Sequence, residues 1–249
     1  IWRCVLKKRN ENNLLDEHAI IVDEASMVDN ALMASLLRAI KPGARLVIIG
    51  DADQLPSVGA GRVLNDIIDS GRFATVRLTE IFRQAQQSLI VTNAHAINEG
   101  AYPNLGVKNN DFFYLYRRTD REIAETVVEL CKTRLPRTYG KATEGGIQII
   151  TPSRKGEAGT ENLNRLLQAA LNPPARGKRE LRYRETVFRV GDRVMQTKNN
   201  YDIEWESGLK SGVGIFNGDI GVIREIDQSE QYMEILFDDR RVLYDFSLL

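Results

Sequence analysis

The sequence is poor in the residues that build disulfide frameworks and metal clusters. Its 249 residues include two cysteines, Cys4 and Cys131, and two histidines, His18 and His95. The cysteines lie far apart and form no pair spacing, which argues against a disulfide framework and against a zinc site. The histidines are also too far apart for a metal cluster. This cysteine usage is typical of a reducing cytosol, so we expect a cytoplasmic protein.

Long apolar runs and an excess of charge are missing as well. No stretch approaches the ~20 apolar residues of a membrane-spanning helix, so we expect no membrane partner. Lys plus Arg equals Asp plus Glu at 34 each, which gives no overall attraction to a polyanion. Any nucleic-acid surface must therefore be a local patch. The 43% of hydrophobic residues is enough for an ordinary globular core.

The sequence also lacks the phosphate-binding loop Gly-x-x-x-x-Gly-Lys-Ser/Thr, which cradles the phosphates of a nucleotide. It starts at Ile1 rather than at a methionine, and residues 242–249 form an apolar, strand-like run without a polar tail. We interpret the chain as a piece of a longer protein.

The first half of the sequence has the pattern of a parallel α/β unit. Residues 19–22 and 46–49 are short continuous apolar runs that suit buried strands, and each run ends close to acidic residues. Between them, residues 30–40 carry apolar side chains at helical spacing, and a Pro-Gly pair stops this helix. Two such strands joined by a helix predict a βαβ unit.

Further elements follow along the chain. We expect helices over residues 61–70, 88–99, 121–135 and 159–171, and strands over 75–78, 112–117 and 146–151. From residue 185 the pattern changes to short alternating strands over 187–195, 219–226, 232–237 and 241–246, which predicts a small β-barrel. The basic stretch 176–184 before it is interpreted as a linker.

Two acids at the end of the first strand are the strongest chemical signal. Asp23 and Glu24 follow a buried strand, where open α/β sheets place their ligands. In nucleotide hydrolases, the first acid of such a pair holds Mg²⁺ and the second can deprotonate the attacking water. The alternative is that one of these acids merely caps the following helix.

Two later segments complete this pattern. The second strand runs into a tight loop, Gly50–Gly61, in which Gln54 can contact a γ-phosphate or the attacking water. The segment 77–84 follows an expected strand and offers an arginine for charge on a γ-phosphoryl group. An ordinary loop and a surface arginine are the alternatives, and spacing alone does not decide whether the arginine has this role.

The order of these segments and their amino-acid sequences resemble the motifs of the RecD/TraA branch of superfamily 1 DNA helicases. The resemblance implies ATP and Mg²⁺ as cofactors. It further implies that Asp23 of the Walker B motif coordinates the metal and Glu24 is the catalytic base, and that Gln54 and Arg83 contact the γ-phosphate. It covers most of the chain and implies an α/β fold of RecA-like (P-loop NTPase) parallel sheets with an inserted Src-homology-3-like β-barrel.

Single-stranded DNA binding needs cations along the backbone and flat faces for bases. Two segments offer them, residues 153–156 after an expected strand end and residues 198–201, where a lysine, two amides and a tyrosine meet. A solvated polar loop is the alternative for each. The candidate DNA-binding residues are Ser57, Thr151, Ser153, Arg154, Lys198, Asn199 and Tyr201.

Three domains are expected: part of a first RecA-like domain over 1–84, part of a second over 85–184, and an incomplete β-barrel over 185–249. We expect the longer protein to be an ATP-dependent DNA helicase acting in repair or recombination, moving 5′ to 3′ by resemblance. Single-stranded DNA, duplex ends and other subunits of a recombination nuclease are the expected partners, and a relaxase fusion is a further possibility. Because the phosphate-binding loop is missing, we expect the isolated chain to bind ATP poorly and hydrolyse none. The alternative is a non-catalytic module for DNA binding or subunit interaction.

Overall fold

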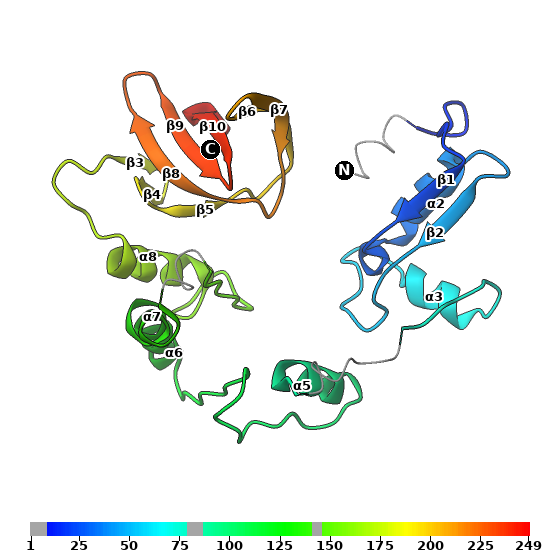
Figure 1. The fold of residues 1–249 in the computed structure, drawn as a ribbon, viewed down its shortest axis with the longest axis horizontal. Helices are drawn as coiled ribbons and strands as arrows, with labels where there is room; N and C mark the ends of the chain where they lie inside the picture. Colours follow the sequence, from blue (N-terminus) through cyan, green and yellow to red (C-terminus); the bar gives the residue numbers. More distant parts are fainter. Residues whose placement is uncertain (1–8, 79–86, 141–145) are drawn as a thin grey trace. The chain divides into compact units, whose positions relative to one another are not determined.

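The computed structural model describes residues 9–78, 87–140 and 146–249. The chain divides into two compact units, residues 1–114 and 115–249 (Figure 1). Each unit is described below by itself.

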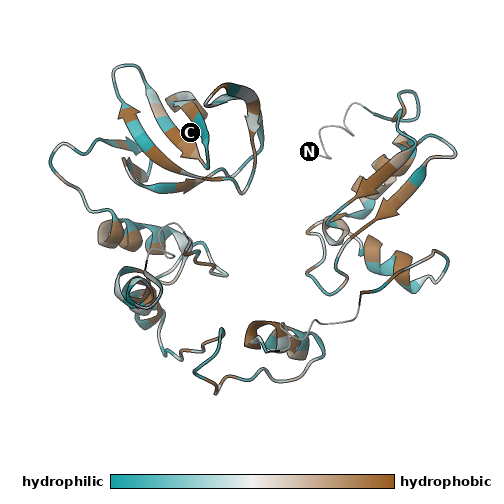
Figure 2. Ribbon diagram, viewed as in Figure 1, coloured by the Kyte–Doolittle hydropathy of each residue, from teal (hydrophilic) through white to brown (hydrophobic). Residues whose placement is uncertain are grey.

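The first unit contains a βαβ arrangement. Strand β1 (Ala19–Val22) pairs in parallel with β2 (Arg45–Ile48), and the ladder ends with Val22 opposite Ile48. Helix α2 (Asn30–Ala39) connects them, and its first turn is capped by the Asp29 side chain, which accepts a hydrogen bond from the Leu32 N–H. Figure 2 shows both strands as largely hydrophobic, as expected for a parallel pair.

The remaining elements of this unit are short. They are the 3-10 turn η1 (Ala25–Met27), α3 (Val63–Asp69) and α5 (Leu89–Asn98). The core packs one face of the strand pair against α2 and α3, and its buried members include Ile20, Val22, Leu36, Ala39 and Leu64.

The second unit begins with helices. Helix α6 (Asp120–Glu129) continues through a π-helical turn, η2 (Leu130–Arg134), into α7 (Leu135–Tyr139). Pro136 lies at the start of α7, and because a proline inside a helix lacks an N–H and crowds the preceding turn, the wider π turn before it has a physical cause. Helix α8 (Thr160–Leu171) packs against α6.

An antiparallel β-barrel follows α8. A six-stranded sheet has the order β5-β8-β9-β10-β6-β7, and β3 pairs with β4 beside it. The strands are β3 (Glu180–Tyr183), β4 (Thr186–Arg189), β5 (Arg193–Met195), β6 (Asn200–Ser207), β7 (Lys210–Ile215), β8 (Ile220–Asp227), β9 (Tyr232–Phe237) and β10 (Arg240–Asp245). A short 3-10 turn, η4 (Phe246–Leu248), ends the chain. The fully buried side chains of its core are Ile215, Ile223, Ile226, Met233, Phe237 and Val242.

The expected combination of a parallel α/β unit and a small antiparallel barrel is confirmed, and so are the helices α2, α3, α5, α6 and α8. Three expected strands are wrong, because residues 75–78, 112–117 and 146–151 contain no strand in the structure. Val76, Leu78 and Ile150 are each about 90% exposed or more, so these apolar side chains find no sheet to join.

The barrel also differs in detail from the expectation. The run 187–195 is two strands rather than one, and the linker interpretation is wrong for Glu180–Tyr183, which forms β3. Strands β6 and β7 were not expected. The three expected domain limits stay predictions. Over the parts of the chain that the structure describes, no helix has the length and apolar character needed to cross a membrane.

Candidate functional site

Asp23 and Glu24 lie directly after β1, in the turn that leads into η1. The Asp23 Oδ1 accepts a hydrogen bond of 2.9 Å from the Glu24 backbone N–H. Glu24 has a φ of 54° and a ψ of 42°, a left-handed conformation that is uncommon for a residue with a side chain. Both side chains belong to exposed residues. The turn therefore presents two carboxylates to solvent at the end of a buried strand.

The loop after β2 starts at the same edge of the sheet. Because β1 and β2 are parallel neighbours, their carboxyl ends lie side by side, and the Ala25 N–H donates to the Ile49 carbonyl at 2.9 Å. Within this loop the Gln54 side-chain amide donates to the Asp51 carboxylate at 3.3 Å. Asp51 also accepts from the Asp53 N–H at 3.0 Å. Gln54 is thus held at the start of the loop by an acid on the second strand end.

Glycines allow the loop after β2 to pack closely against the turn after β1. A Cβ atom on Gly50 would lie 3.0 Å from the Ala25 backbone nitrogen and 3.1 Å from the Ser26 nitrogen, so a side chain at position 50 would push the turns apart. Farther along, the Asn30 N–H donates to the Ala60 carbonyl at 2.9 Å, and Gly59 touches the capping carboxylate of Asp29. The loop after β2 is therefore fixed to the turn after β1 at both of its ends.

Ser57 belongs to the same loop and is partly buried. Its hydroxyl donates to the Gly59 carbonyl at 3.0 Å, so in this structure it shapes the loop. Among the described side chains, the Ser26 hydroxyl is a buried polar atom without a hydrogen-bond partner. A buried polar group of this kind calls for an explanation such as a bound water or ligand. Ser26 lies two residues after Glu24, so this unpaired hydroxyl is located at the candidate site.

The residues at this edge fit a Mg²⁺ ion that is bound partly by a nucleotide. Mg²⁺ prefers oxygen ligands and is commonly held by one or two carboxylates together with phosphates and waters. Asp23 supplies such a carboxylate and is exposed. In the described residues, no cluster of three or more His, Cys, Asp or Glu side chains could hold a metal by itself. The donor set therefore suits a metal that arrives with phosphates.

The structure brings together some of the expected site residues. Asp23, Glu24, Gln54 and Ser57 lie at one sheet edge of the first unit. Arg83 lies outside the described residues. The six expected DNA-binding residues from Thr151 onward belong to the second unit: five lie in two loops, and Tyr201 lies at the start of β6 directly after the second loop.

The first of these loops folds back on the start of α8. Its Ser153 and Arg154 carbonyls accept hydrogen bonds from the N–H groups of Thr160 and Glu161, at 3.1 and 3.2 Å. The Arg154 guanidinium also forms an exposed ion pair with Glu161 at 2.8 Å. The Thr151 hydroxyl donates to the Ala158 carbonyl at 2.8 Å and so closes the loop.

The second loop joins β5 to β6. The Gln196 side-chain amide donates to the Lys198 carbonyl at 2.6 Å, and the Tyr244 hydroxyl donates to the other end of the same amide at 2.7 Å. The Asn199 amide donates to the Tyr201 hydroxyl at 3.0 Å. Lys198 and Asn199 are both exposed, and the backbone that carries the Lys198 cation is held in place by these hydrogen bonds.

Two ring and turn contacts complete this second loop. The Tyr201 ring packs edge to face on Phe216, with centroids 5.6 Å apart. The side-chain Oδ1 of Asn199 accepts from the Asn217 backbone N–H at 2.9 Å. No role was predicted for Phe216-Asn217-Gly218-Asp219, whose turn supports the loop. Its Asn-Gly pair is the sequence signal that marks a turn here.

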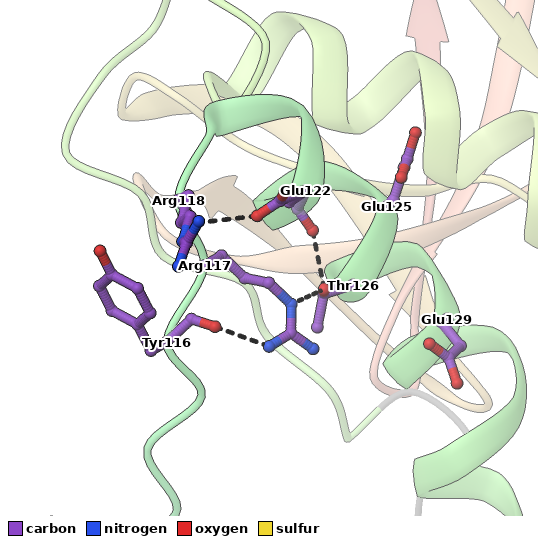
Figure 3. A pocket seen from close by; sticks show the side chains of 7 residues that line it. All are labelled: Tyr116, Arg117, Arg118, Glu122, Glu125, Thr126 and Glu129. Atoms are coloured by element: carbon purple, nitrogen blue, oxygen red, sulfur yellow. Dashed lines mark hydrogen bonds between the residues drawn. The ribbon is translucent and has the colours of Figure 1, made fainter.

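A shallow pocket of about 590 Å³ lies where the chain enters α6 (Figure 3). Two of its charged side chains form hydrogen bonds within the protein: the Arg117 guanidinium donates to the Thr126 hydroxyl at 2.7 Å, and the Glu122 carboxylate accepts from the Arg118 backbone N–H at 2.8 Å. The expected site residues do not line this pocket. We interpret this pocket as the surface around the capped N-terminal end of α6.

Comparison with known families adds two matches. A model described as an AAA domain matches residues 2–113, and one described as the SH3 domain of ATP-dependent RecD-like DNA helicases matches residues 163–237. The second match includes most of α8 together with the barrel as far as β9. The expected RecA-like α/β fold with a Src-homology-3-like barrel is thereby confirmed.

Individual relatives point the same way. The ATP-dependent RecD2 DNA helicase of Deinococcus radiodurans is 38% identical over 205 residues, which cover 82% of this chain and 25% of that protein. The RecBCD enzyme subunit RecD of Mycobacterium tuberculosis is 30% identical over 234 residues, 87% of this chain and 37% of that protein. A structure of the Pif1 helicase from Bacteroides with ADP-AlF3 and single-stranded DNA covers 94% of this chain and 54% of that one. At 19% identity and a TM-score of 0.47, that likeness is too slight to add to the argument.

A parallel sheet edge with paired acids, together with a small barrel, defines a RecA-like nucleotide-hydrolase fold that carries an added domain. Within that class, the chain is a relative of the RecD-like DNA helicases of superfamily 1. It spans between 25% and 37% of the length of these two curated relatives.

Proposed function

We propose that this chain is the central part of an ATP-dependent DNA helicase that couples ATP hydrolysis to movement along single-stranded DNA, 5′ to 3′ by resemblance. The observation that carries the proposal is the sheet edge where Asp23 and Glu24 follow β1 and the loop with Gln54 follows the neighbouring parallel strand β2, because open α/β sheets bind their ligands at this edge. The Deinococcus radiodurans relative is an ATP-dependent DNA helicase by name, which supports the same activity for the longer protein.

Each residue at this edge has a proposed task. Asp23 holds the metal, and a bound Mg²⁺ would neutralise phosphate charge. Glu24 accepts the proton of the attacking water, for which its exposed carboxylate and fixed backbone are suited. Gln54 contacts the γ-phosphate or the water, and Asp51 orients it. Arg83 is proposed to stabilise the charge on the γ-phosphoryl group.

The second unit is proposed to contact DNA through its two loops. Lys155 of the first loop and Lys198 of the second are exposed cations for phosphates, and Tyr201, three residues after Lys198, offers an aromatic ring for bases. Duplex ends and other subunits of a recombination nuclease are proposed as further partners, in repair or recombination. The cytoplasmic location stays a prediction.

Substitution of Glu24 tests the assignment. In the longer protein, Glu24→Gln should leave nucleotide binding nearly unchanged and lower DNA-stimulated ATP hydrolysis by about 10²–10⁴-fold, the usual contribution of a general base. The matched control is Glu17→Gln, an exposed acid before β1, which should hydrolyse ATP at the wild-type rate. We expect the isolated chain to show little ATP binding and no turnover.

Other outcomes have clear meanings. Wild-type turnover by Glu24→Gln would remove Glu24 from the role of base. Absence of ATP hydrolysis from the longer protein, with single-stranded DNA still bound, would instead favour a non-catalytic DNA-binding module.

A further inference from the structure

Helix α8 is attached at its start to the first DNA loop. The Ser153 and Arg154 carbonyls accept from the first N–H groups of the helix, and Arg154 pairs with Glu161 one turn in. Gly159 fits tightly here, since a Cβ atom on it would lie 2.5 Å from the Lys155 carbonyl oxygen. The loop and the helix start therefore form one unit of structure.

The other end of α8 is attached to the barrel through one carboxylate. Asp192, in the turn between β4 and β5, accepts from the Gln168 side-chain amide at 2.5 Å and from the Asn172 side-chain amide at 2.7 Å. Its Oδ2 also accepts from the Arg189 N–H at 2.8 Å. Gln168 donates in addition to the Val187 carbonyl, and Asn172 to the Val190 carbonyl, at 2.7 and 3.1 Å.

This contact between the end of α8 and the barrel, here called the joint, also contains a buried arginine. Arg189 has 7% of its surface exposed, and its guanidinium donates to Glu180 at 2.6 Å and to the Asn172 carbonyl. Ionised carboxylates accept short, strong hydrogen bonds from such donors. Figure 1 shows α8 between α6 and the β3–β5 side of the barrel, in agreement with these contacts.

We propose that α8 is a rigid strut that holds the two DNA loops at a fixed spacing, and that Asp192 is the positioning residue that fastens the barrel to it. This inference rests on the proposed DNA function. The 12 residues of the helix span about 18 Å. The first loop is fixed at its start, and the barrel that carries Lys198 is fixed near its end, so a strand of DNA meets both loops as one surface.

The chemistry of Asp192 makes the joint testable by the replacement of one oxygen atom with an NH2 group. All three of its partners named above are N–H donors, so the carboxylate acts only as an acceptor. In Asp192→Asn, the NH2 group must face at least one of these donors. The side-chain volume hardly changes, while the joint loses one of its two acceptor oxygens and the negative charge.

The geometry of the joint is measured first, without DNA. Spin labels at Asn164 on α8 and at Leu209 on the barrel, both exposed, report the distance across the joint. The background carries Cys4→Ser, and Cys131 reacts slowly because it is buried and burial raises the pKa of its thiol. We expect a narrow distance distribution in the wild type and a broad one in Asp192→Asn.

DNA binding is measured second, as anisotropy of a labelled oligo-dT. Asp192→Asn should weaken binding by about 10–100-fold, because two joined contact surfaces no longer engage together. Lys198→Ala should cost clearly less affinity in the Asp192→Asn background than in the wild type. The matched control is Asp238→Asn in the exposed β9–β10 turn, which loses the same charge and should bind like the wild type.

Equal distance distributions in wild type and Asp192→Asn, or an unchanged cost of Lys198→Ala, would overturn the strut. If the wild type binds no single-stranded DNA, the proposed function fails together with it, whereas normal binding by Asp192→Asn removes the strut alone. Should Asp192→Asn fail to fold by circular dichroism, Gln168→Ala removes only one donor and gives the same two tests with a smaller expected change.

Discussion

Single residues at the first candidate site act through their size as much as through their charge. Asp29 caps α2, and the loop that carries Gln54 passes directly over it because position 59 has no side chain. The sheet edge keeps its shape only while Gly50 and Gly59 stay small. Two predictions belong to this scale.

The first prediction concerns Gly59. In Gly59→Ala the new Cβ would lie 2.2 Å from the Asp29 Oδ2 atom, so the carboxylate must leave its capping position. We expect the free energy of unfolding to fall by about 1–2 kcal/mol, the value of a lost helix cap. Thermal denaturation measures this change.

The control for this prediction is Gly106→Ala. Its nearest non-neighbouring atom would be 3.9 Å away, an ordinary contact, and the stability should change by less than about 0.5 kcal/mol. Removing the cap first, in Asp29→Ala, should make Gly59→Ala less harmful. Equal losses in the two glycine variants would contradict the steric explanation.

The second prediction concerns Tyr244, which is 4% exposed and donates to Gln196. Burial, and to a smaller extent the negative charge of Asp219, raises the pKa of its phenol to about 12. Because the protonated phenol is neutral, the folded protein gains from it fully below the unfolded pKa of about 10. That stability should be lost as the pH rises from about 10 to about 12.

Denaturant unfolding at pH 9, 10 and 11 measures this loss of stability. Tyr244→Phe should unfold more easily at neutral pH by about 1 kcal/mol, for the lost hydrogen bond, but show a flatter decline above pH 10. A decline as steep as in the wild type would show that other groups, such as Tyr232 with its pKa also raised by burial, cause it.

Strands were predictable from the sequence where an apolar run also has a neighbouring strand with which it can pair. The runs 19–22 and 46–49 are apolar throughout and lie one helix apart, so the parallel pair and the edge with Asp23 and Gln54 followed from them. Residues 75–78 and 146–151 are also rich in β-branched residues but include polar ones, and they pair with no strand among the residues that the structure describes. Composition gives a tendency to form a strand, whereas neighbouring strands decide whether one forms.

Strands β6 and β7 are present although they were not predicted from the sequence. In β6 (Asn200–Ser207), Tyr201, Ile203 and Trp205 alternate with polar residues, which is the signal of a half-buried strand. The flanking lysine and asparagines made this segment resemble a turn. The glycine contacts and the acceptor role of Asp192 were not predictable, because they depend on atoms that only the fold brings together.

At the scale of the whole chain, the two units have separate hydrophobic cores. The first core includes Leu36 at 2% exposure, and the barrel core includes Ile226 at 0%. Proteins with separate cores need not unfold as one cooperative system. We therefore predict two transitions in calorimetry of the 249-residue chain.

Core truncations assign the two transitions. Leu36→Ala and Ile226→Ala should each lower one transition, by about 2–5 kcal/mol for the unit concerned, and leave the other in place. Residues in different cores that share no contacts give additive effects, so the double variant should lower both transitions by the same amounts as the single ones. A single transition that moves with either substitution would mean that the units unfold together, and the cores would then be coupled through contacts that join them.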